Sequence, residues 1–193
     1  MFPTRKDEIL TQAARLFRKR GYRGTSLKTI ANAVGMEAAP SLYNHISSKQ
    51  AILAELLLTV ARRFEKGMNR VLAQERSPRE QLTRLISLHV QLTVEHPDAI
   101  ALVWQEWVHL KDDHQEEFLK LRNHYEQHFR QILQNGMEQG AFRAFDLELT
   151  LFALLSTLRA LYAWYARNQD YGRQHLEEQL TRILLLGLVE EHQ

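Results

Sequence analysis

The sequence predicts an all-α protein, and three observations support this fold class. Apolar residues recur with helical spacing along almost the whole chain. The 193 residues include only 4 Pro and 8 Gly, so long helices can run without interruption. No segment shows the alternation typical of a strand. We expect an N-terminal three-helix domain at residues 1–50, with a helical bundle at residues 51–193.

Three helices are expected in the first 50 residues. The first begins at Thr4, which is spaced to form a capping box with Asp7, and ends at Gly21. The second runs over residues 26–34, with Thr25 or Ser26 as its cap. The third starts with Pro40 in its first turn and reaches about residue 46.

The remaining helices are separated by short joints. A long connecting helix starts near residue 48, where Ser47 and Gln50 are spaced as a capping box, and continues to about residue 74. Pro, Gly and capping residues then divide the chain into helices expected at 77–95, 97–110, 111–136, 146–167 and 172–189.

Charge and composition narrow the function class. The first 50 residues carry nine Lys and Arg against three acids, a formal charge of +6, whereas the remainder carries −4. A basic head on an acidic body favours a polyanion-binding module joined to a regulatory one, although a merely soluble basic patch explains the charge equally well.

With no cysteine and no apolar N-terminal stretch, a reducing cytoplasm is the simplest setting. The apolar stretch at 147–166 contains Arg159 and is interpreted as a buried helix, so no membrane is expected.

Two short helices joined by a glycine-containing turn in a basic segment make a helix-turn-helix candidate. This segment resembles the N-terminal domain of TetR-type repressors over roughly the first 55 residues. The resemblance is carried by Ile9-Leu10, Ala13-Ala14, Leu16-Phe17, Gly21-Tyr22, Thr25-Ser26, Ile30-Ala31, Val34-Gly35, Ser41-Leu42-Tyr43-Asn44-His45-Ile46, Ser48-Lys49 and Ile52-Leu53.

One feature of the head departs from the family pattern. In most members the turn glycine lies seven residues before the tyrosine of the third helix, whereas Gly35 and Tyr43 are eight apart. The extra residue falls among Met36 to Ala39. The entry of the recognition helix into the major groove is therefore left open.

Position and resemblance together assign the DNA contacts. The start of the recognition helix meets base edges, so base contacts are expected from Ala39, Pro40, Ser41 and Asn44. The resemblance implies phosphate contacts from Thr25, Tyr43, His45 and Lys49; Tyr43 packed in the core with its hydroxyl outward is the alternative. Lys28 could reach either a base or a phosphate, and Ser26 is the last of the residues predicted to contact DNA. Leu42 and Ile46 are expected in the core, and Arg18, Lys19 and Arg20 on a solvated face.

The body is expected to bind a small-molecule effector and to form a homodimer. A pocket between its helices would be lined by aromatic and polar residues: His89, Trp104, Trp107, Tyr125, Phe129, Arg159 and Tyr162. Arg159 needs either an anionic ligand or, as is commoner, an acid within the protein or across a subunit interface, and each aromatic residue taken singly is more often core than pocket lining. The last two helices carry more large apolar residues than one internal face needs, which favours dimerisation there. Gln105-Glu106-Trp107, residues 136–142 and Trp164-Tyr165 resemble a regulator branch whose effectors are acyl-CoA thioesters.

Other functions are less well supported. His124 and His128 are four apart on a helix and could share an ion, but no carboxylate ligand is fixed nearby, so neither a metal nor a cofactor is expected. No P-loop, nucleophile elbow or dinucleotide loop is present. A helical enzyme or ligand carrier is one alternative, and an activator or ligand-free nucleoid-type protein is another.

Overall fold

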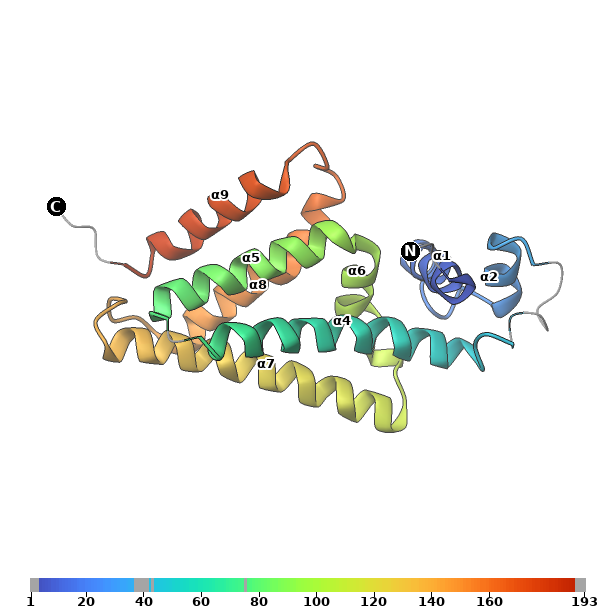
Figure 1. The fold of residues 1–193 in the computed structure, drawn as a ribbon, viewed down its shortest axis with the longest axis horizontal. Coiled ribbons are helices and arrows are strands. Elements are labelled where there is room, and N and C mark those ends of the chain that lie inside the picture. Colours follow the sequence, from blue (N-terminus) through green and yellow to red (C-terminus); the bar gives the residue numbers. More distant parts are fainter. Residues whose placement is uncertain (1–3, 37–41, 43, 75, 190–193) are drawn as a thin grey trace. The chain divides into compact units, whose positions relative to one another are not determined.

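The computed structural model describes residues 4–36, 42, 44–74 and 76–189, and every regular element within them is helical (Figure 1). The all-α prediction is confirmed. Of the third helix expected over 40–46, residues 40, 41 and 43 lie outside the described residues, and the described residues 44–46 are not assigned to a helix. The elements are α1 (Arg5–Arg20), α2 (Leu27–Ala33), α4 (Lys49–Leu72), α5 (Pro78–Glu95), α6 (Pro97–Gln105), the short 3₁₀ helix η1 (Trp107–His109), α7 (Asp112–Glu138), α8 (Leu147–Tyr165) and α9 (Arg173–Leu186).

Local capping fixes most helix starts. In the predicted box of α1, the Asp7 amide donates to Thr4 Oγ1 at 3.2 Å and the Thr4 amide donates to Asp7 Oδ2 at 2.9 Å. The predicted box of Ser47 and Gln50 is wrong, since the Ala51 amide donates to Ser48 Oγ at 3.0 Å. The Gln50 side chain therefore does not take part in the cap and forms a tertiary contact instead.

The single helix expected over 97–110 is shorter than predicted. α6 ends at Gln105, and the chain continues in the tighter turns of η1, where the His109 amide donates to the Glu106 carbonyl. The His109 carbonyl accepts from Gln50 Nε2 at 3.0 Å. A tertiary partner thus takes a carbonyl that a continuing helix would have used itself.

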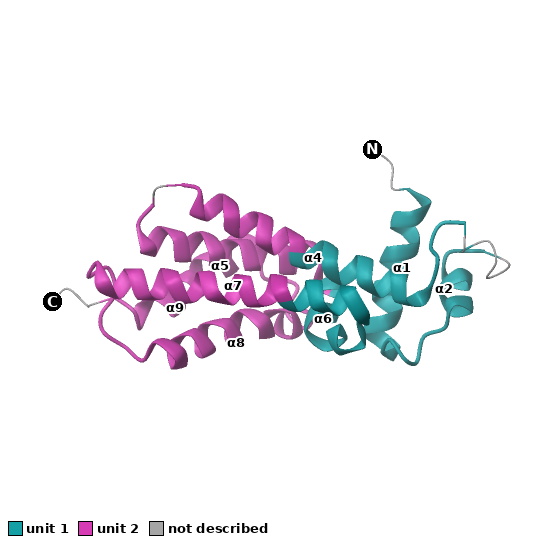
Figure 2. Ribbon diagram, turned by 90° about the horizontal axis from the view of Figure 1, so that it is seen from below, with its two compact units in different colours: residues 1–61, 98–119 teal, residues 62–97, 120–193 magenta. Residues whose placement is uncertain are grey.

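The chain divides into two compact units (Figure 2). Unit 1 contains residues 1–61 and 98–119, and unit 2 contains residues 62–97 and 120–193. Residues 98–119, which the sequence assigned to the body, therefore belong to the same compact unit as the head. Helices α4 and α7 each contribute residues to both units.

Each unit has its own apolar core. In unit 1, α1 packs against α2, and the predicted core residues Leu42 and Ile46 are buried. In unit 2, α5 packs against α8 and α9 around Val90, Leu161 and Leu176. α8 is also long and apolar enough, by length and composition alone, to cross a membrane.

Candidate functional site

The surface of unit 1 carries part of the predicted DNA-binding set. Ser26, Lys28, Asn44 and His45 are exposed. Ser26 Oγ also caps α2 by accepting from the Thr29 amide at 3.1 Å. The remaining predicted residues of the recognition helix, namely Ala39, Pro40, Ser41 and Tyr43, lie outside the described residues.

Two residues expected at phosphates are engaged within the protein. The Thr25 side chain is buried, and its hydroxyl donates to the carbonyls of Gly21 at 3.0 Å and Leu16 at 3.3 Å. Lys49 Nζ donates to the carbonyls of Tyr22 at 2.9 Å and Thr25 at 2.8 Å, and it lies 4.3 Å from the centre of the Tyr22 ring. Both side chains therefore hold the turn between α1 and α2 in place.

A shallow cavity of about 420 Å³ lies beside this turn. It is lined by Lys49 and by the turn residues Arg23, Gly24, Thr25, Ser26 and Leu27. Arg23 is exposed and Lys49 is half-buried at this surface. The cavity therefore has cationic side chains at its edge, as a surface that meets a polyanion requires.

Sequence reasoning missed the contacts that join the head to residues 98–119. The Tyr22 hydroxyl donates to Gln50 Oε1 at 2.8 Å, and the ring of Tyr22 stacks on that of His109 at 5.5 Å between centres. Arg18, expected on a solvated face, instead donates to Asp98 Oδ1 at 2.5 Å. Its partner is 80 residues away in the chain, so no local pattern could reveal it.

Three of the predicted effector-binding residues meet inside unit 2. His89, Tyr125 and Phe129 are buried together with Phe64, which sequence reasoning did not include. The ring centres lie 5.5 Å apart for His89 and Tyr125, 5.1 Å for Tyr125 and Phe129, and 4.6 Å for His89 and Phe64. Contributions from α4, α5 and α7 make up this aromatic cluster, defined here as Phe64, His89, Tyr125 and Phe129.

Two buried polar atoms of the aromatic cluster, His89 Nε2 and the Tyr125 hydroxyl, have no hydrogen-bond partner among the described residues. The same holds for Thr93 Oγ1, which lies outside the cluster, one helical turn from His89. Burial lowers the pKa of His89 to about 3, with the positive charge of Arg159 adding to the effect, and burial raises the pKa of Tyr125 well above its ordinary value. Both side chains are therefore neutral near pH 7.

Arg159 has an internal acidic partner. Its guanidinium donates to Glu126 Oε1, and Arg122 Nε lies 3.8 Å from the same oxygen. Tyr162 is half-buried on α8. Trp104 and Trp107 belong to unit 1, where Trp107 stacks on Phe118 at 6.2 Å between ring centres, so they are not part of the aromatic cluster.

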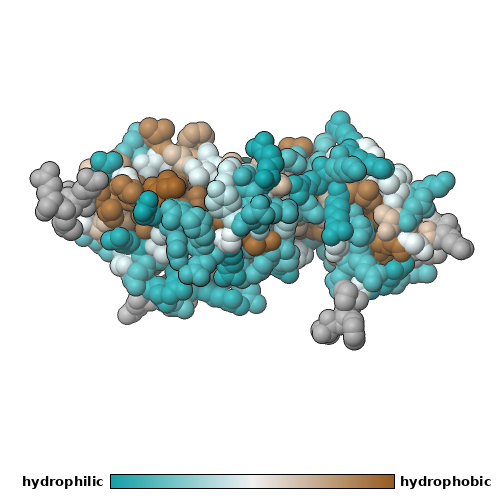
Figure 3. Space-filling model, turned by 90° about the horizontal axis from the view of Figure 1, so that it is seen from above, coloured by the Kyte–Doolittle hydropathy of each residue, from teal (hydrophilic) through white to brown (hydrophobic). Residues whose placement is uncertain are grey.

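An apolar surface covers α8 and α9 in unit 2. Its large exposed side chains are Leu149, Phe152, Trp164, Tyr171, Ile183 and Leu186, with Phe152 67% and Leu149 64% exposed. Figure 3 shows brown apolar patches near the C-terminal end of unit 2. Between α8 and α9 lies a cavity of about 490 Å³, whose lining includes Trp164, Tyr171, Leu180 and Ile183. Apolar surface of this kind marks an interaction site.

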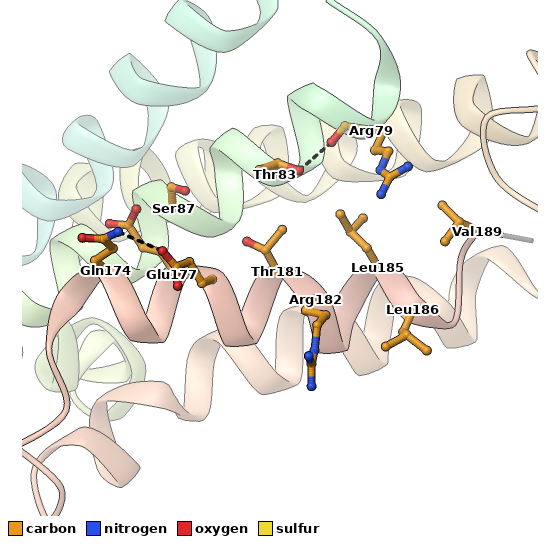
Figure 4. Close-up of a pocket in the computed structure, with 11 residues that line it drawn as sticks. Arg79, Thr83, Ser87, Gln174, Glu177, Thr181, Arg182, Leu185, Leu186 and Val189 are labelled. Atoms are coloured by element: carbon orange, nitrogen blue, oxygen red, sulfur yellow. Dashed lines mark hydrogen bonds between the residues drawn. The ribbon is translucent and has the colours of Figure 1, made fainter. Parts of the chain in front are cut away.

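A second groove of unit 2, about 550 Å³ in volume, runs between α5 and α9 (Figure 4). Most of the residues that line it have polar side chains and are at least partly exposed, including Arg79, Thr83 and Arg182. Thr83 Oγ1 donates to the Arg79 carbonyl at 2.9 Å along one wall. The groove is therefore a solvated surface feature and contains none of the predicted site residues.

The two histidines considered for a metal do lie together on α7. The ring centres of His124 and His128 are 4.6 Å apart, and His124 Nδ1 is 3.5 Å from Glu65 Oε1. Among the described residues, no group of three or more histidines and carboxylates is arranged to hold a metal ion.

Two family profiles match the chain. Residues 75–188 match the profile described as "Tetracyclin repressor-like, C-terminal domain", and residues 9–56 match "Bacterial regulatory proteins, tetR family". The first of these covers more than half of the chain.

Individual proteins match over nearly the whole length. The HTH-type transcriptional repressor KstR2 of Mycolicibacterium smegmatis is 29% identical over 190 residues, covering 97% of this chain and 92% of its own. The structure of the ketosteroid transcriptional regulator KstR2 of Mycobacterium tuberculosis superimposes with a TM-score of 0.91 at 24% identity, covering 99% and 98% of the two chains. AibR in complex with isovaleryl coenzyme A and operator DNA gives a TM-score of 0.79 at 23% identity, covering 93% and 97%.

Proposed function

Since the chain belongs to the TetR family of transcriptional regulators, we propose that it is a ligand-responsive repressor that leaves its operator when a small molecule binds the body. The protein is a transcriptional repressor of this family rather than an enzyme. The observation that carries the proposal is the pairing of a basic helix-turn-helix head with a regulatory body in one chain. Such a protein works on DNA in the cytoplasm.

Operator binding is assigned to the head. The exposed Ser26, Lys28, Asn44 and His45 are the described residues proposed to reach DNA. The sequence adds Ala39, Pro40, Ser41 and Tyr43 on the recognition helix. Thr25 and Lys49 are proposed to act by positioning the turn that carries Ser26, because their polar atoms bind backbone carbonyls.

Dimerisation is assigned to the apolar surface of α8 and α9. A second copy would cover the exposed Phe152, Ile183 and Leu186, and a two-fold dimer fits a palindromic operator with half-sites a helical turn or more apart. Large exposed apolar patches are uncommon on a monomer.

The effector is assigned to the interior of unit 2, around the aromatic cluster and Arg159. The positive charge of Arg159 acts on both His89 and Tyr125 of the aromatic cluster, and a cation at this place favours an anionic ligand. The complex of AibR with isovaleryl coenzyme A supports an acyl-CoA thioester as the class of effector.

Release of DNA requires the effector to bind one state of the body more tightly than another. Helices α4 and α7 contribute residues to both units, so a rearrangement in unit 2 can reach unit 1 through these helices. In unit 1, Gln50 of α4 is hydrogen-bonded to both Tyr22 and His109. We propose that this junction transmits the change to the head.

The test is fluorescence anisotropy with DNA from the region upstream of the gene. We expect sequence-specific binding that weakens steeply with salt, and release by CoA thioesters but not by the matching free acids. Absence of specific binding at low salt would exclude a repressor and favour a ligand carrier. Specific binding that no effector reverses would favour a ligand-free DNA-binding protein.

A further inference from the structure

We propose that the effector carries an uncharged oxygen function, a ketone or a hydroxyl, on its apolar part, and that His89, Thr93 and Tyr125 hold this oxygen inside unit 2. The inference rests on the proposed function for the existence of an effector. It deepens that function by naming a chemical feature that the effector must have.

The three side chains are deeply buried, with 2% of His89, 1% of Thr93 and 8% of Tyr125 exposed. Within the part of the chain that the structure describes, His89 Nε2, Thr93 Oγ1 and the Tyr125 hydroxyl have no hydrogen-bond partner. Buried polar atoms in folded proteins almost always have partners, because an unpaired one is costly. Three such atoms on α5 and α7, two helices whose His89 and Tyr125 rings are neighbours, therefore indicate a partner that the described residues do not provide.

The three groups are placed to act together. His89 and Thr93 are four residues apart on α5, so their side chains share one face of the helix. The Tyr125 ring, on α7, lies 5.5 Å from the His89 ring. Phe64 and Phe129 flank them, with ring centres 4.6 Å and 6.2 Å from His89. The polar atoms thus lie among aromatic side chains, as they do in a pocket that binds a mainly apolar ligand.

The chemistry of the three groups selects an uncharged oxygen. Tyrosine and threonine hydroxyls can donate to a ketone, and a neutral histidine can either donate to or accept from a hydroxyl. A carboxylate in this position would lose its hydration among aromatic rings, and the guanidinium of Arg159 is already hydrogen-bonded to Glu126. A plain hydrocarbon would leave all three atoms unpaired and would be rejected for that reason.

A stability measurement tests the pairing without any ligand. Tyr125→Phe and Thr93→Val remove one unpaired atom each while keeping the shape of the side chain. We expect each to raise the Tm of the ligand-free protein by roughly 2–4 °C, whereas the control Tyr165→Phe, on half-buried Tyr165 of α8, should not raise it. A fall in Tm for both variants would mean that these atoms have structural partners such as buried water, and would overturn the proposal.

A binding measurement tests the oxygen itself. Isothermal titration calorimetry would compare octanoyl-CoA, 7-oxooctanoyl-CoA and 7-hydroxyoctanoyl-CoA. We expect at least one oxygenated thioester to bind tenfold or more tighter than octanoyl-CoA, and this preference to disappear in a Thr93→Val/Tyr125→Phe double variant. Equal binding of the three, failure of all three to bind, or a preference that survives the double variant would overturn the proposal.

The two proposals fail in different ways. Operator DNA that is released equally by octanoyl-CoA and 7-oxooctanoyl-CoA refutes only the oxygen preference. A native protein that binds no operator refutes the proposed function, whatever the calorimetry shows.

Discussion

Lys49 offers a direct test of how the head is built, because it can be either a clamp within the protein or a phosphate contact. Its ammonium group donates to two backbone carbonyls at 2.9 Å and 2.8 Å and lies over the Tyr22 ring. Hydrogen bonds from a charged donor contribute about 1.5–3 kcal/mol each in favourable settings, and an exposed cation–π contact about 0.5–1 kcal/mol. Because Lys49 is only half-buried, solvent screening reduces the summed contribution below these values.

Substituting Lys49→Met keeps the aliphatic stem and removes only the charged donor. We expect a loss of about 2–3 kcal/mol in the free energy of unfolding, measured by urea denaturation, and a matching fall in Tm. Weaker operator binding should follow, with an unchanged dependence of the binding constant on salt concentration, because no phosphate contact has been removed.

Lys28→Met is the matched control, since Lys28 is exposed on α2. If Lys28 contacts a phosphate, Lys28→Met should change the free energy of unfolding by no more than about 0.5 kcal/mol. It should also lower the salt slope, the steepness with which the logarithm of the operator-binding constant falls with the logarithm of salt concentration, by about one for each head. The clamp interpretation is refuted if Lys49→Met leaves stability unchanged and instead lowers the salt slope in the same way as Lys28→Met.

Three further predictions concern unit 2. A Cβ added at Gly136 would lie 2.0 Å and 2.3 Å from ring atoms of the buried Phe142, so Gly136→Ala should lower the free energy of unfolding by about 1–3 kcal/mol. The control Gly187→Ala, where nothing lies within 4 Å, should not lower it, and equal Tm values for the two variants would contradict this. The pKa of His89 is about 3 in the folded protein, below its ordinary value of 6.5, so the unfolded chain binds a proton that the folded protein does not. Stability should therefore fall as pH drops from 6.5 toward 3, by up to about 1.4 kcal/mol per pH unit, and urea denaturation of His89→Phe should show a correspondingly flatter pH dependence. Phe152→Glu should convert the proposed dimer into a folded monomer in sedimentation experiments, and a dimer that persists would exclude this part of the α8–α9 surface as the interface.

Local chemistry made much of the fold predictable. The capping box of Thr4 and Asp7 involves residues three apart, and the glycine stop at Gly21 depends only on its own backbone, which has φ of +74°. These features can be predicted from a short window of sequence. The start of α4 shows the limit, because Ser47 and Ser48 are both possible caps and only the surrounding structure selects Ser48.

Tertiary partners were not predictable in the same way. A lysine at the start of α4 fits a phosphate contact as well as a clamp, and the carbonyls that Lys49 binds are 24 and 27 residues away. The sequence suggested His89 and Tyr125 for the pocket because both combine an apolar body with a polar tip. It did not identify Phe64, because its approach to them depends on how α4 packs against α5 and α7.

Helix α8 shows why composition alone could not decide whether a helix lies in a membrane, in the core of the protein or at an interface between two copies of the chain. Its 19 residues pass for a membrane span by length and hydropathy, and only 28% of its most apolar window is buried within the chain. Arg159 near its middle argues against a lipid environment, since a charge at the centre of a bilayer costs about 2.5–3.5 kcal/mol or more. A fully buried core helix does not explain the exposure of Leu149 and Phe152. A second copy of the chain accounts for both, because it would cover the apolar side chains and leave Arg159 paired with Glu126.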